Sequence, residues 1–373
     1  MNILFCGSVV PNEIEFQVKG ISAAGNRFQN NMIKNLEQLG HEVRLRSFVG
    51  VPISPEIENA LNQRNDLDST YVVKGRKLIN SVRTYGRLVG QIMNDTDIVV
   101  CYNITYAWLF LPYWAKRRKK KSIVILADYS ESISYKSVAG KLYAKLQLWS
   151  MRQFETVVGL SANIRGKIKK NQEFVLMEGG IDQDFYDAFA YRSHLENQPL
   201  CFMYAGLLSQ VTGVDMLLQA MELVECPDIR LIISGKGPLE EAVKKAASKD
   251  DRICYKGHMV YQQYIEQLQT ADVFLNPRNM RLPENQNNFP SKIMDYLATG
   301  KRIISTKFAG WESFRDYLIV CESNVEDIAA AITQTAEKCS GIGPSKEDFD
   351  KQRHFARNFL WSRQIERMIK PKG

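Results

Sequence analysis

Short, continuous apolar runs alternate with longer amphipathic stretches along nearly the whole chain. A short apolar run is typical of a strand buried on both faces of a parallel sheet, and an amphipathic stretch is typical of a helix that covers such a sheet. Their alternation predicts βαβ units and an α/β fold. In the first half we expect strands at 2–7, 42–48, 97–102, 122–127, 156–160 and 174–178, with helices near 28–39, 76–94, 105–120 and 136–153.

The pattern starts again after an irregular, polar stretch at 183–199. A chain of 373 residues is long enough for two domains of about 150 residues or more. We therefore expect two doubly wound, Rossmann-like parallel-sheet domains, at 1–187 and 188–350, facing each other across a cleft, with a final helix at 351–373. The second set of strands is predicted at 200–205, 229–234, 252–256, 272–276, 302–306 and 318–321.

Composition excludes several other classes of protein. Hydrophobic residues make up 45% of the chain and charged residues 24%, as in ordinary soluble globular proteins. No apolar stretch approaches the roughly 18–20 residues of a membrane-spanning helix, and the N-terminus shows neither the basic region nor the cleavage site of a secretory signal. The seven cysteines are scattered without a CxxC pair, which is typical of reduced thiols. These features predict a cytoplasmic protein.

The positive charge is concentrated in the first half of the chain. Residues 1–187 contain 25 basic and 18 acidic side chains, whereas the remainder contains 24 and 23. This asymmetry indicates an anionic partner for the first half: a membrane, a nucleic acid or a phosphorylated substrate. The alternative is that the charge serves solubility alone.

The most informative segment, 276–306, runs from a predicted strand through a polar loop into a helix and the next strand. Pro290 is placed just inside the start of that helix, where its missing N–H costs nothing. Lys292 in the first turn, together with Arg278 after the strand, predicts an anion site near the free N–H groups of the helix. Asp295, one turn further, is suited to bind a ribose diol. The alternatives are a solvated helix-face lysine and a surface carboxylate.

This segment resembles the donor-site motif of the retaining glycosyltransferases of family 4. That family usually carries two glutamates separated by seven residues, with Phe-Pro near the helix start; the matching positions here are Asn287, Asp295 and Phe289-Pro290. Pro-Ser-Lys-Ile at 290–293 and Gly-Lys at 300–301 resemble the branch that builds bacterial capsule, O-antigen and exopolysaccharide. The similarity covers nearly the whole chain.

The resemblance implies a GT-B fold, with an acceptor-binding domain at 1–187, a nucleotide-sugar-binding domain at 188–350 and a last helix, 351–373, that crosses back to the first domain. It implies retaining transfer of a hexosyl group from a UDP-sugar to a polyprenyl-diphosphate-linked glycan. In such transfer the leaving phosphate helps to deprotonate the incoming hydroxyl, so the protein mainly positions substrates and neutralises phosphate charge. No metal and no other cofactor is then required.

The donor-site residues that the resemblance implies are Gly25, Gly206, Lys236, His258, Arg278, Phe289, Pro290, Ser291, Lys292 and Asp295. Two departures from the family pattern are evident. The Arg and Lys that usually follow the first strand of the second domain are Leu207 and Thr212, and the first carboxylate of the motif is Asn287. Asn287 is expected to approach the transferred sugar, with Glu284 able to substitute in part. Asp128, after the strand at 122–127, is the expected acceptor-site carboxylate; its alternative role is a helix N-cap.

A third segment combines aromatic side chains with six consecutive cations at 116–121. Aromatic residues favour the headgroup level of a bilayer, and cations are attracted to anionic lipid. We therefore expect peripheral binding to the inner face of the cell membrane, supported by a basic amphipathic helix at 136–153; the alternative is a core-facing helix with a solvated basic end. Nucleic acid is not expected, since no RNA-binding motif accompanies the run. The membrane residues are Trp108, Trp114, Lys116, Arg117, Arg118, Lys119, Lys120 and Lys121.

Other functions stay open at this point. The missing Arg, Lys and Glu are compatible with a non-catalytic partner subunit of the same fold, whereas Lys292 and Asp295 argue for a working donor site. A nucleotide-sugar epimerase of similar fold is the nearest enzymatic alternative.

Overall fold

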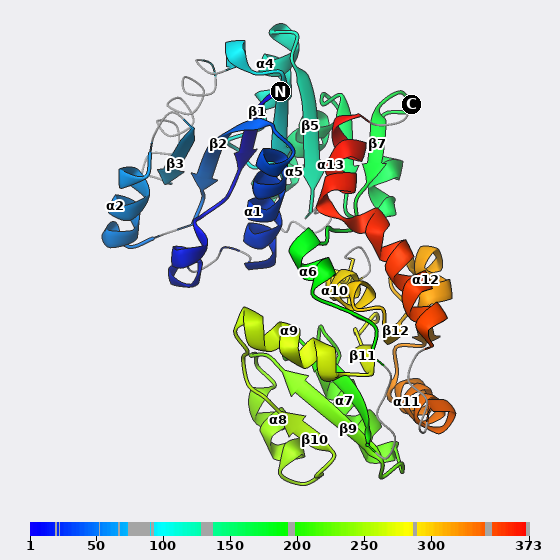
Figure 1. The fold of residues 1–373 in the computed structure, drawn as a ribbon. Helices are drawn as coiled ribbons and strands as arrows, with labels where there is room; N and C mark the ends of the chain where they lie inside the picture. The colour runs from blue at the N-terminus through cyan, green and yellow to red at the C-terminus, as the bar shows by residue number, and fades with distance from the viewer. Residues whose placement is uncertain are drawn as a thin grey trace. The chain divides into compact units, whose positions relative to one another are not determined.

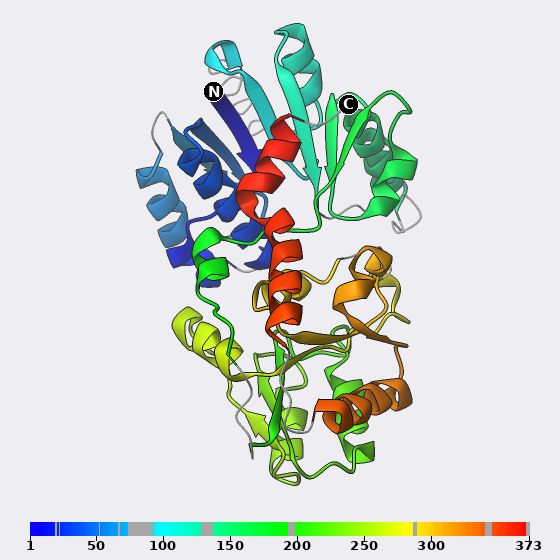
Figure 2. The same cartoon turned by 45° about the vertical axis from the view of Figure 1, so that its right-hand side comes forward.

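The computed structural model describes residues 1–18, 21, 23–51, 53–65, 68–73, 90, 93–127, 137–192, 198–285, 289–339 and 345–370. The chain divides into two compact units, which are coloured along the chain in Figure 1 and seen from a second side in Figure 2. Unit 1 comprises Met1–Gly180 and Trp361–Gly373, and unit 2 comprises Ile181–Leu360. Within the described ranges, no helix combines the length and the apolar character needed to cross a membrane.

Unit 1 contains a parallel sheet of seven strands in the order β3-β2-β1-β4-β5-β6-β7. In β1, Ile3 is paired with Val43 of β2 on one side and with Ile98 of β4 on the other. Both faces of the sheet are buried, which accounts for the continuous apolar runs in the sequence. The strands are β1 (Asn2–Gly7), β2 (Glu42–Val49), β3 (Ser69–Val73), β4 (Ile98–Tyr102), β5 (Lys121–Leu126), β6 (Thr156–Gly159) and β7 (Glu173–Leu176).

Helices cover both faces of this sheet. One core contains side chains of α1 (Ala23–Gln38), α2 (Pro55–Gln63) and α13 (Trp361–Ile369), and the other contains side chains of α4 (Leu111–Arg117) and α5 (Val138–Met151). The helix expected near 105–120 begins only at Leu111, with Pro112 in its first turn. The helix expected near 76–94 lies largely outside the described residues. Short 3₁₀ helices are η1 (Asn12–Gln17), η2 (Met93–Asp95) and η4 (Ala162–Lys167).

Unit 2 contains a second parallel sheet, of six strands in the order β10-β9-β8-β11-β12-β13. Side chains of α7 and α11 pack on one face, and those of α9 and α10 pack on the other. The strands are β8 (Leu200–Ala205), β9 (Ile229–Ser234), β10 (Ile253–Tyr255), β11 (Val273–Asn276), β12 (Arg302–Thr306) and β13 (Ile319–Cys321). The helices are α6 (Gln183–Asp187), α7 (Val214–Leu223), α8 (Glu240–Ala247), α9 (Tyr261–Thr270), α10 (Lys292–Ala298), α11 (Val325–Cys339) and α12 (Lys346–Ala356), with the 3₁₀ helices η5 (Pro283–Asn285), η6 (Trp311–Tyr317) and η7 (Arg357–Phe359).

Each sheet has one topological switch point, where the chain changes the direction in which it adds strands. It lies between β1 and β4 in unit 1 and between β8 and β11 in unit 2. In doubly wound sheets, ligands bind beyond the carboxyl ends of the strands at this point. The predicted fold class, two Rossmann-like parallel-sheet domains, is thus confirmed, and the switch points show where to look for chemistry.

The final helix, expected at 351–373, is divided at Leu360, whose backbone is extended (φ −57°, ψ 138°). Leu360 forms a bridge with Ile181, and the Ile181 N–H donates to the Phe359 carbonyl at 2.8 Å. The chain before this point belongs to unit 2, and α13 after it belongs to unit 1. There the Gln364 amide donates to the Gly179 carbonyl at 3.0 Å.

Candidate functional site

Three loops follow β8, β9 and β10 at the carboxyl edge of the unit 2 sheet, and their backbones are in direct contact. The Gly206 N–H donates to the Ser234 carbonyl at 2.8 Å, and the Gly235 N–H donates to the Gly257 carbonyl at 2.9 Å. A Cβ atom at Gly235 would lie 1.7 Å from the Gly206 oxygen. Only glycine fits there, so peptide groups rather than side chains form this part of the site.

Lys292 of α10 extends its ammonium group to the end of β8. Its Nζ lies 3.4 Å from the Tyr204 hydroxyl and 4.9 Å from the centroid of the Tyr204 ring. A Cβ atom at Gly206 would lie 2.0 Å from Lys292 Cε and 2.2 Å from Nζ, so the absence of a side chain at Gly206 makes room for the lysine. A half-buried cation is thereby held at the switch point of the sheet.

Arg278, directly after β11, supplies a second cation on the other side of the switch point. Its Nε donates to Oδ1 of Asn285 at 2.5 Å. Asn285 is fully buried, and its amide nitrogen donates to the carbonyls of Val211 and Asn279 at 2.7 Å each. Burial lowers the pKa of the Arg278 guanidinium, and the nearby Tyr204 opposes this shift. A bound anion would offset the cost of burying this charge.

Asp295 lies one turn beyond Lys292 on α10, as the sequence predicts. The hydroxyl of Tyr264, on α9, donates to its Oδ2 at 3.1 Å and orients the carboxylate. The next residue, Tyr296, is fully buried; its ring stacks on Phe274 of β11 at 4.4 Å, and its hydroxyl accepts a hydrogen bond from the Ala205 N–H at 3.3 Å. Tyr296 therefore fixes α10 against β8 and β11, and with it the positions of Lys292 and Asp295.

The start of α10 differs in part from the expectation. Ser291 is the exposed N-cap and Pro290 is buried before it, so the helix comprises only the seven residues from Lys292 to Ala298. Phe289 packs edge-on against Phe308, with ring centroids 5.3 Å apart, and so anchors the loop in the core. A helix this short has a small dipole, so charge stabilisation at the site rests mainly on the two cationic side chains.

The remaining donor-site positions are more exposed. Lys236 and His258, in the loops after β9 and β10, are exposed side chains. Leu207, where the family carries an Arg, is 55% exposed. Thr212, where the family carries a Lys, donates its hydroxyl hydrogen to the Leu207 carbonyl at 2.6 Å, so it braces the loop instead of reaching outward.

Lys301, just before β12, is another half-buried lysine of unit 2. Burial lowers its pKa to about 8, partly opposed by Asp272. Its Nζ donates to the carbonyls of Leu268 and Gln269, at 3.1 and 2.6 Å, and to that of Ala271. These carbonyls lie at the C-terminal end of α9, so Lys301 caps that helix and is not a ligand-binding group.

The sequence also predicts Asp128, Asn287, Glu284 and Gly25 as site residues. Asp128 and Asn287 lie outside the described residues, and Glu284 is part of η5. Gly25 is in the first turn of α1, where its carbonyl accepts a hydrogen bond from the Gln29 amide at 3.1 Å. In the part of the chain that the structure describes, no three side chains of His, Cys, Asp or Glu are grouped so that they could hold a metal ion.

The aromatic and basic segment of unit 1 is only partly exposed. Trp108 is 0% exposed and packs in the core beneath α4, so its prediction as a membrane residue is wrong. Trp114 is half-buried. The ammonium groups of Lys120 and Lys121 donate to the carbonyls of Asn94 and Ile369, at 2.8 Å each, and join neighbouring elements. Of the six cations, those with exposed side chains are Lys116, Arg117 and Lys119.

Sequence reasoning missed two residues that orient the predicted ones. Tyr264 binds Asp295, and Asn285 binds Arg278. Tyr264 lies in an ordinary amphipathic helix, and Asn285 is one of several asparagines in a polar loop, so neither carries a signal of its own in the sequence.

Comparisons with known proteins add to this geometry. Residues 199–338 match the family model described as glycosyl transferases group 1. A comparison with curated protein sequences found no match. Solved structures of similar fold include a glycosyltransferase from Rickettsia africae (17% identity, TM-score 0.70, covering 100% of this chain and 99% of that chain). They also include HepE from Anabaena in complex with UDP (13%, 0.69, 100% of both chains) and sucrose-phosphate synthase from Thermosynechococcus elongatus (13%, 0.65, 99% and 98%).

The family match covers the segment that contains both switch-point cations and Asp295, from β8 through most of α11. The structural similarities cover both units at low sequence identity, and they show the fold. The chain therefore has the GT-B fold, and its residues 199–338 are similar to the glycosyl transferases group 1.

Proposed function

We propose that the protein is a retaining, metal-independent glycosyltransferase that moves a hexosyl group from a UDP-sugar to a lipid-linked glycan in the synthesis of a cell-surface polysaccharide such as capsule. The observation that carries the proposal is the half-buried ammonium of Lys292, held beside Gly206 at the switch point of the group 1 domain. Unit 2 binds the donor in this proposal, and unit 1 binds the acceptor, a polyprenyl-diphosphate-linked chain.

The chemistry of the site supports this placement of the donor. Lys292 and Arg278, on either side of the switch point, are suited to contact the diphosphate, and the carboxylate of Asp295 is suited to accept from the ribose hydroxyls. The negative charge on the diphosphate grows as the sugar leaves, so cations fixed in advance stabilise the transition state more than the ground state. HepE, which has a similar fold, was solved in complex with UDP, and this supports a uridine nucleotide as the donor's carrier.

The site of action follows from the proposed acceptor. A polyprenyl-linked glycan lies at the membrane, so we propose that the protein binds peripherally to the cytoplasmic face of the cell membrane. The exposed cations Lys116, Arg117 and Lys119 support this location, since each cation near an anionic surface adds about 1 kcal/mol of attraction.

A non-catalytic partner subunit is the second candidate, favoured by the replacement of two family cations with Leu207 and Thr212. The Thr212 hydroxyl donates a hydrogen bond to the Leu207 carbonyl within its own loop, as described above. Slow hydrolysis of a nucleotide sugar by the purified protein would favour the enzyme. A nucleotide-sugar epimerase would instead convert the free donor into its isomer without an acceptor.

The proposed donor class is tested by thermal unfolding with UDP, GDP, ADP and their sugars. UDP and a UDP-sugar should raise the apparent stability, by about 2.7 kcal/mol at a concentration 100 times the dissociation constant. GDP and ADP should have smaller effects at the same concentration. Equal shifts for all three nucleotides would contradict the choice of uridine, and no shift with any of them would contradict a nucleotide-sugar donor.

Asn287 is expected to govern the choice of sugar rather than the choice of nucleotide, because it matches the family position that approaches the transferred sugar. Asn287→Ala should lower the transfer rate about 10- to 100-fold, since a hydroxyl that loses its hydrogen bond costs about 1–3 kcal/mol. Affinity for free UDP should be unchanged. Asn287→Glu, which restores the usual residue of the family, should alter the preferred donor.

The measurement is turnover across a panel of donors, with UDP affinity as the internal control. If both Asn287 variants keep the wild-type rate and donor preference, Asn287 is only a loop residue. Glu284→Gln then tests the remaining candidate for the sugar-facing group.

A further inference from the structure

Six large apolar or aromatic side chains are exposed on two neighbouring elements of unit 1. Val138 and Leu142 of α5, for example, are 85% and 59% exposed. The six represent nearly half of the thirteen large hydrophobic side chains that are exposed in the described part of the chain. Such a concentration marks an interaction surface. We name it the α4–α5 surface; it consists of Phe110, Tyr113, Val138, Leu142, Leu146 and Trp149.

The surface is continuous. Its α5 members follow one another at intervals of three or four residues, so they share one face of the helix. Trp149 of α5 contacts Phe110, which precedes α4, with ring centroids 6.0 Å apart. Tyr113 follows Phe110 after one turn.

The unit 1 core does not use this surface. Other side chains of α5, Ala144 and Met151, are buried in the core. Two further side chains fix the helix to the preceding segment: the Tyr143 hydroxyl and the Gln147 amide both donate to the Ile104 carbonyl, at 3.2 and 2.6 Å. The exposed face is therefore available to a partner outside unit 1.

The charged side chains of α4 and α5 are all positive. Lys141 and Lys145 are exposed on α5 among the apolar side chains, and Lys116 and Arg117 are exposed on α4. Neither α4 nor α5 contains an acidic residue. An apolar face rich in Leu and Trp, on helices whose own charged side chains are all cations, complements an anionic lipid surface, in which acyl chains lie beneath negative headgroups.

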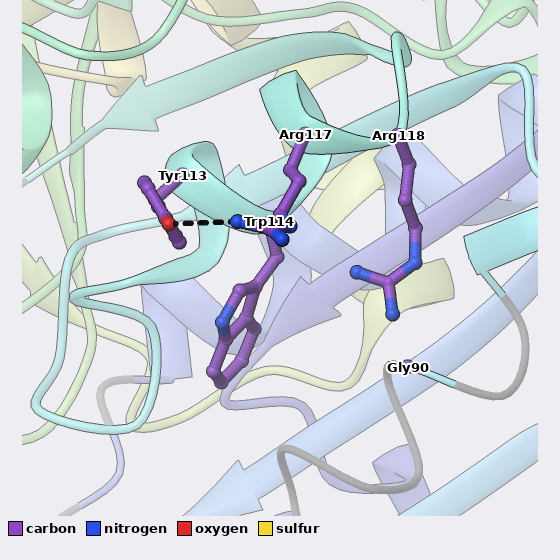
Figure 3. A pocket seen from close by; sticks show the side chains of 5 residues that line it. All are labelled: Gly90, Tyr113, Trp114, Arg117 and Arg118. Carbon is purple, nitrogen blue, oxygen red and sulfur yellow. Dashed lines mark hydrogen bonds between the residues drawn. The ribbon is translucent and has the colours of Figure 1, made fainter.

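A hollow beside the surface adds a place for a phosphate group. It has a volume of about 390 Å³ and is lined by Gly90, Tyr113, Trp114, Arg117 and Arg118. Figure 3 shows the two guanidinium groups on the same side of α4 as the Trp114 ring. The Arg117 guanidinium donates a hydrogen bond to the Tyr113 hydroxyl at 3.4 Å. Two arginines beside aromatic rings are well suited to bind the phosphate of a lipid headgroup.

We propose that the α4–α5 surface inserts into the interfacial layer of an anionic bilayer and that Arg117 and Arg118 bind lipid phosphate beside it. This inference rests on the proposed function, because insertion into the bilayer would bring the enzyme to its membrane-bound acceptor. The salt dependence of binding distinguishes this insertion from attraction by the basic run alone. The contribution of buried apolar area to binding persists at high salt, whereas the attraction between exposed charges is screened. Insertion of Leu142 and Trp149 is thus the main source of affinity.

The test measures flotation of the full chain with vesicles of phosphatidylcholine, with and without phosphatidylglycerol, at low and high salt. The double variant Leu142→Gln, Trp149→Gln should lower the partition coefficient at least 10-fold at both salt concentrations. Lys141→Gln with Lys145→Gln should lower it only a few-fold, and mainly at low salt. Leu223→Gln, on α7 of unit 2, is the matched control, since Leu223 is 54% exposed and should not affect binding.

The inference is overturned if the Leu142, Trp149 variant floats like the wild type or if phosphatidylglycerol makes no difference to binding. It is also overturned if the variant abolishes self-association of the chain while vesicle binding is unchanged. Hydrolysis of the donor in solution should be the same in the variant and the wild type. Because hydrolysis and flotation are measured separately, failure of the proposed enzyme activity and failure of membrane insertion give different results.

Discussion

Lys292→Ala is expected to weaken the binding of UDP about 30-fold. The half-buried Lys292 ammonium lies beside Tyr204 and Gly206 at the switch point, where the proposed site receives the diphosphate. A hydrogen bond from a charged donor contributes about 2 kcal/mol, which corresponds to that loss. The affinity is measured by titration calorimetry with UDP, and the control is Lys245→Ala, which removes an exposed lysine of α8.

Gly206→Ala should reproduce the loss of UDP affinity without removing the lysine side chain from the protein. The new methyl group would lie 2.0 Å from Lys292 Cε, so Lys292 must move away from the end of β8. Combining the two substitutions should therefore weaken UDP binding little further than Lys292→Ala alone, since both remove the same interaction. Full additivity, or wild-type affinity in either single variant, would contradict the placement of the diphosphate beside Lys292.

The fold could be predicted to a large extent because a doubly wound sheet is a local pattern. Strands buried on both faces are short apolar runs, and all six strands of the unit 2 sheet formed at predicted runs. In the unit 1 sheet six of the seven strands did so, whereas the edge strand β3 (Ser69–Val73) was not predicted. The prediction failed where one pattern has two causes. Trp108 stands near a run of cations, as an interfacial tryptophan does, but it points into the core.

The residues of the candidate site could be predicted only where they lie close together in one segment of the sequence. Lys292 and Asp295 share α10, so their spacing and the resemblance together placed them on one helix. Their supports come from elsewhere: Tyr264 reaches Asp295 from a different helix, and Gly206 makes room for Lys292 from a different strand. Contacts between segments this far apart depend on tertiary packing, which a single sequence does not record.

The break at Leu360 has a consequence for stability, because it sends α13 back to unit 1. Trp361, the first residue of α13, is 2% exposed, and its ring meets Phe28 of α1 edge-on with centroids 4.9 Å apart. A Cβ atom at Gly180 would lie 2.2 Å from the same ring, so the indole packs directly on the backbone where the chain leaves unit 1. One side chain thus joins α13, α1 and the end of the first segment of unit 1.

Trp361→Ala should therefore destabilise unit 1 by about 3–5 kcal/mol, the usual cost of truncating a buried tryptophan. The expected result is a lower unfolding midpoint for unit 1 in denaturant, with faster amide hydrogen exchange in α13 and α1. Gly180→Ala should act in the same direction, since it displaces the indole. The matched control is Trp149→Ala, because Trp149 is 42% exposed and its removal leaves the core intact. If Trp361→Ala unfolds like the control and α13 keeps its protection, the last helix does not depend on Trp361 for its place in unit 1.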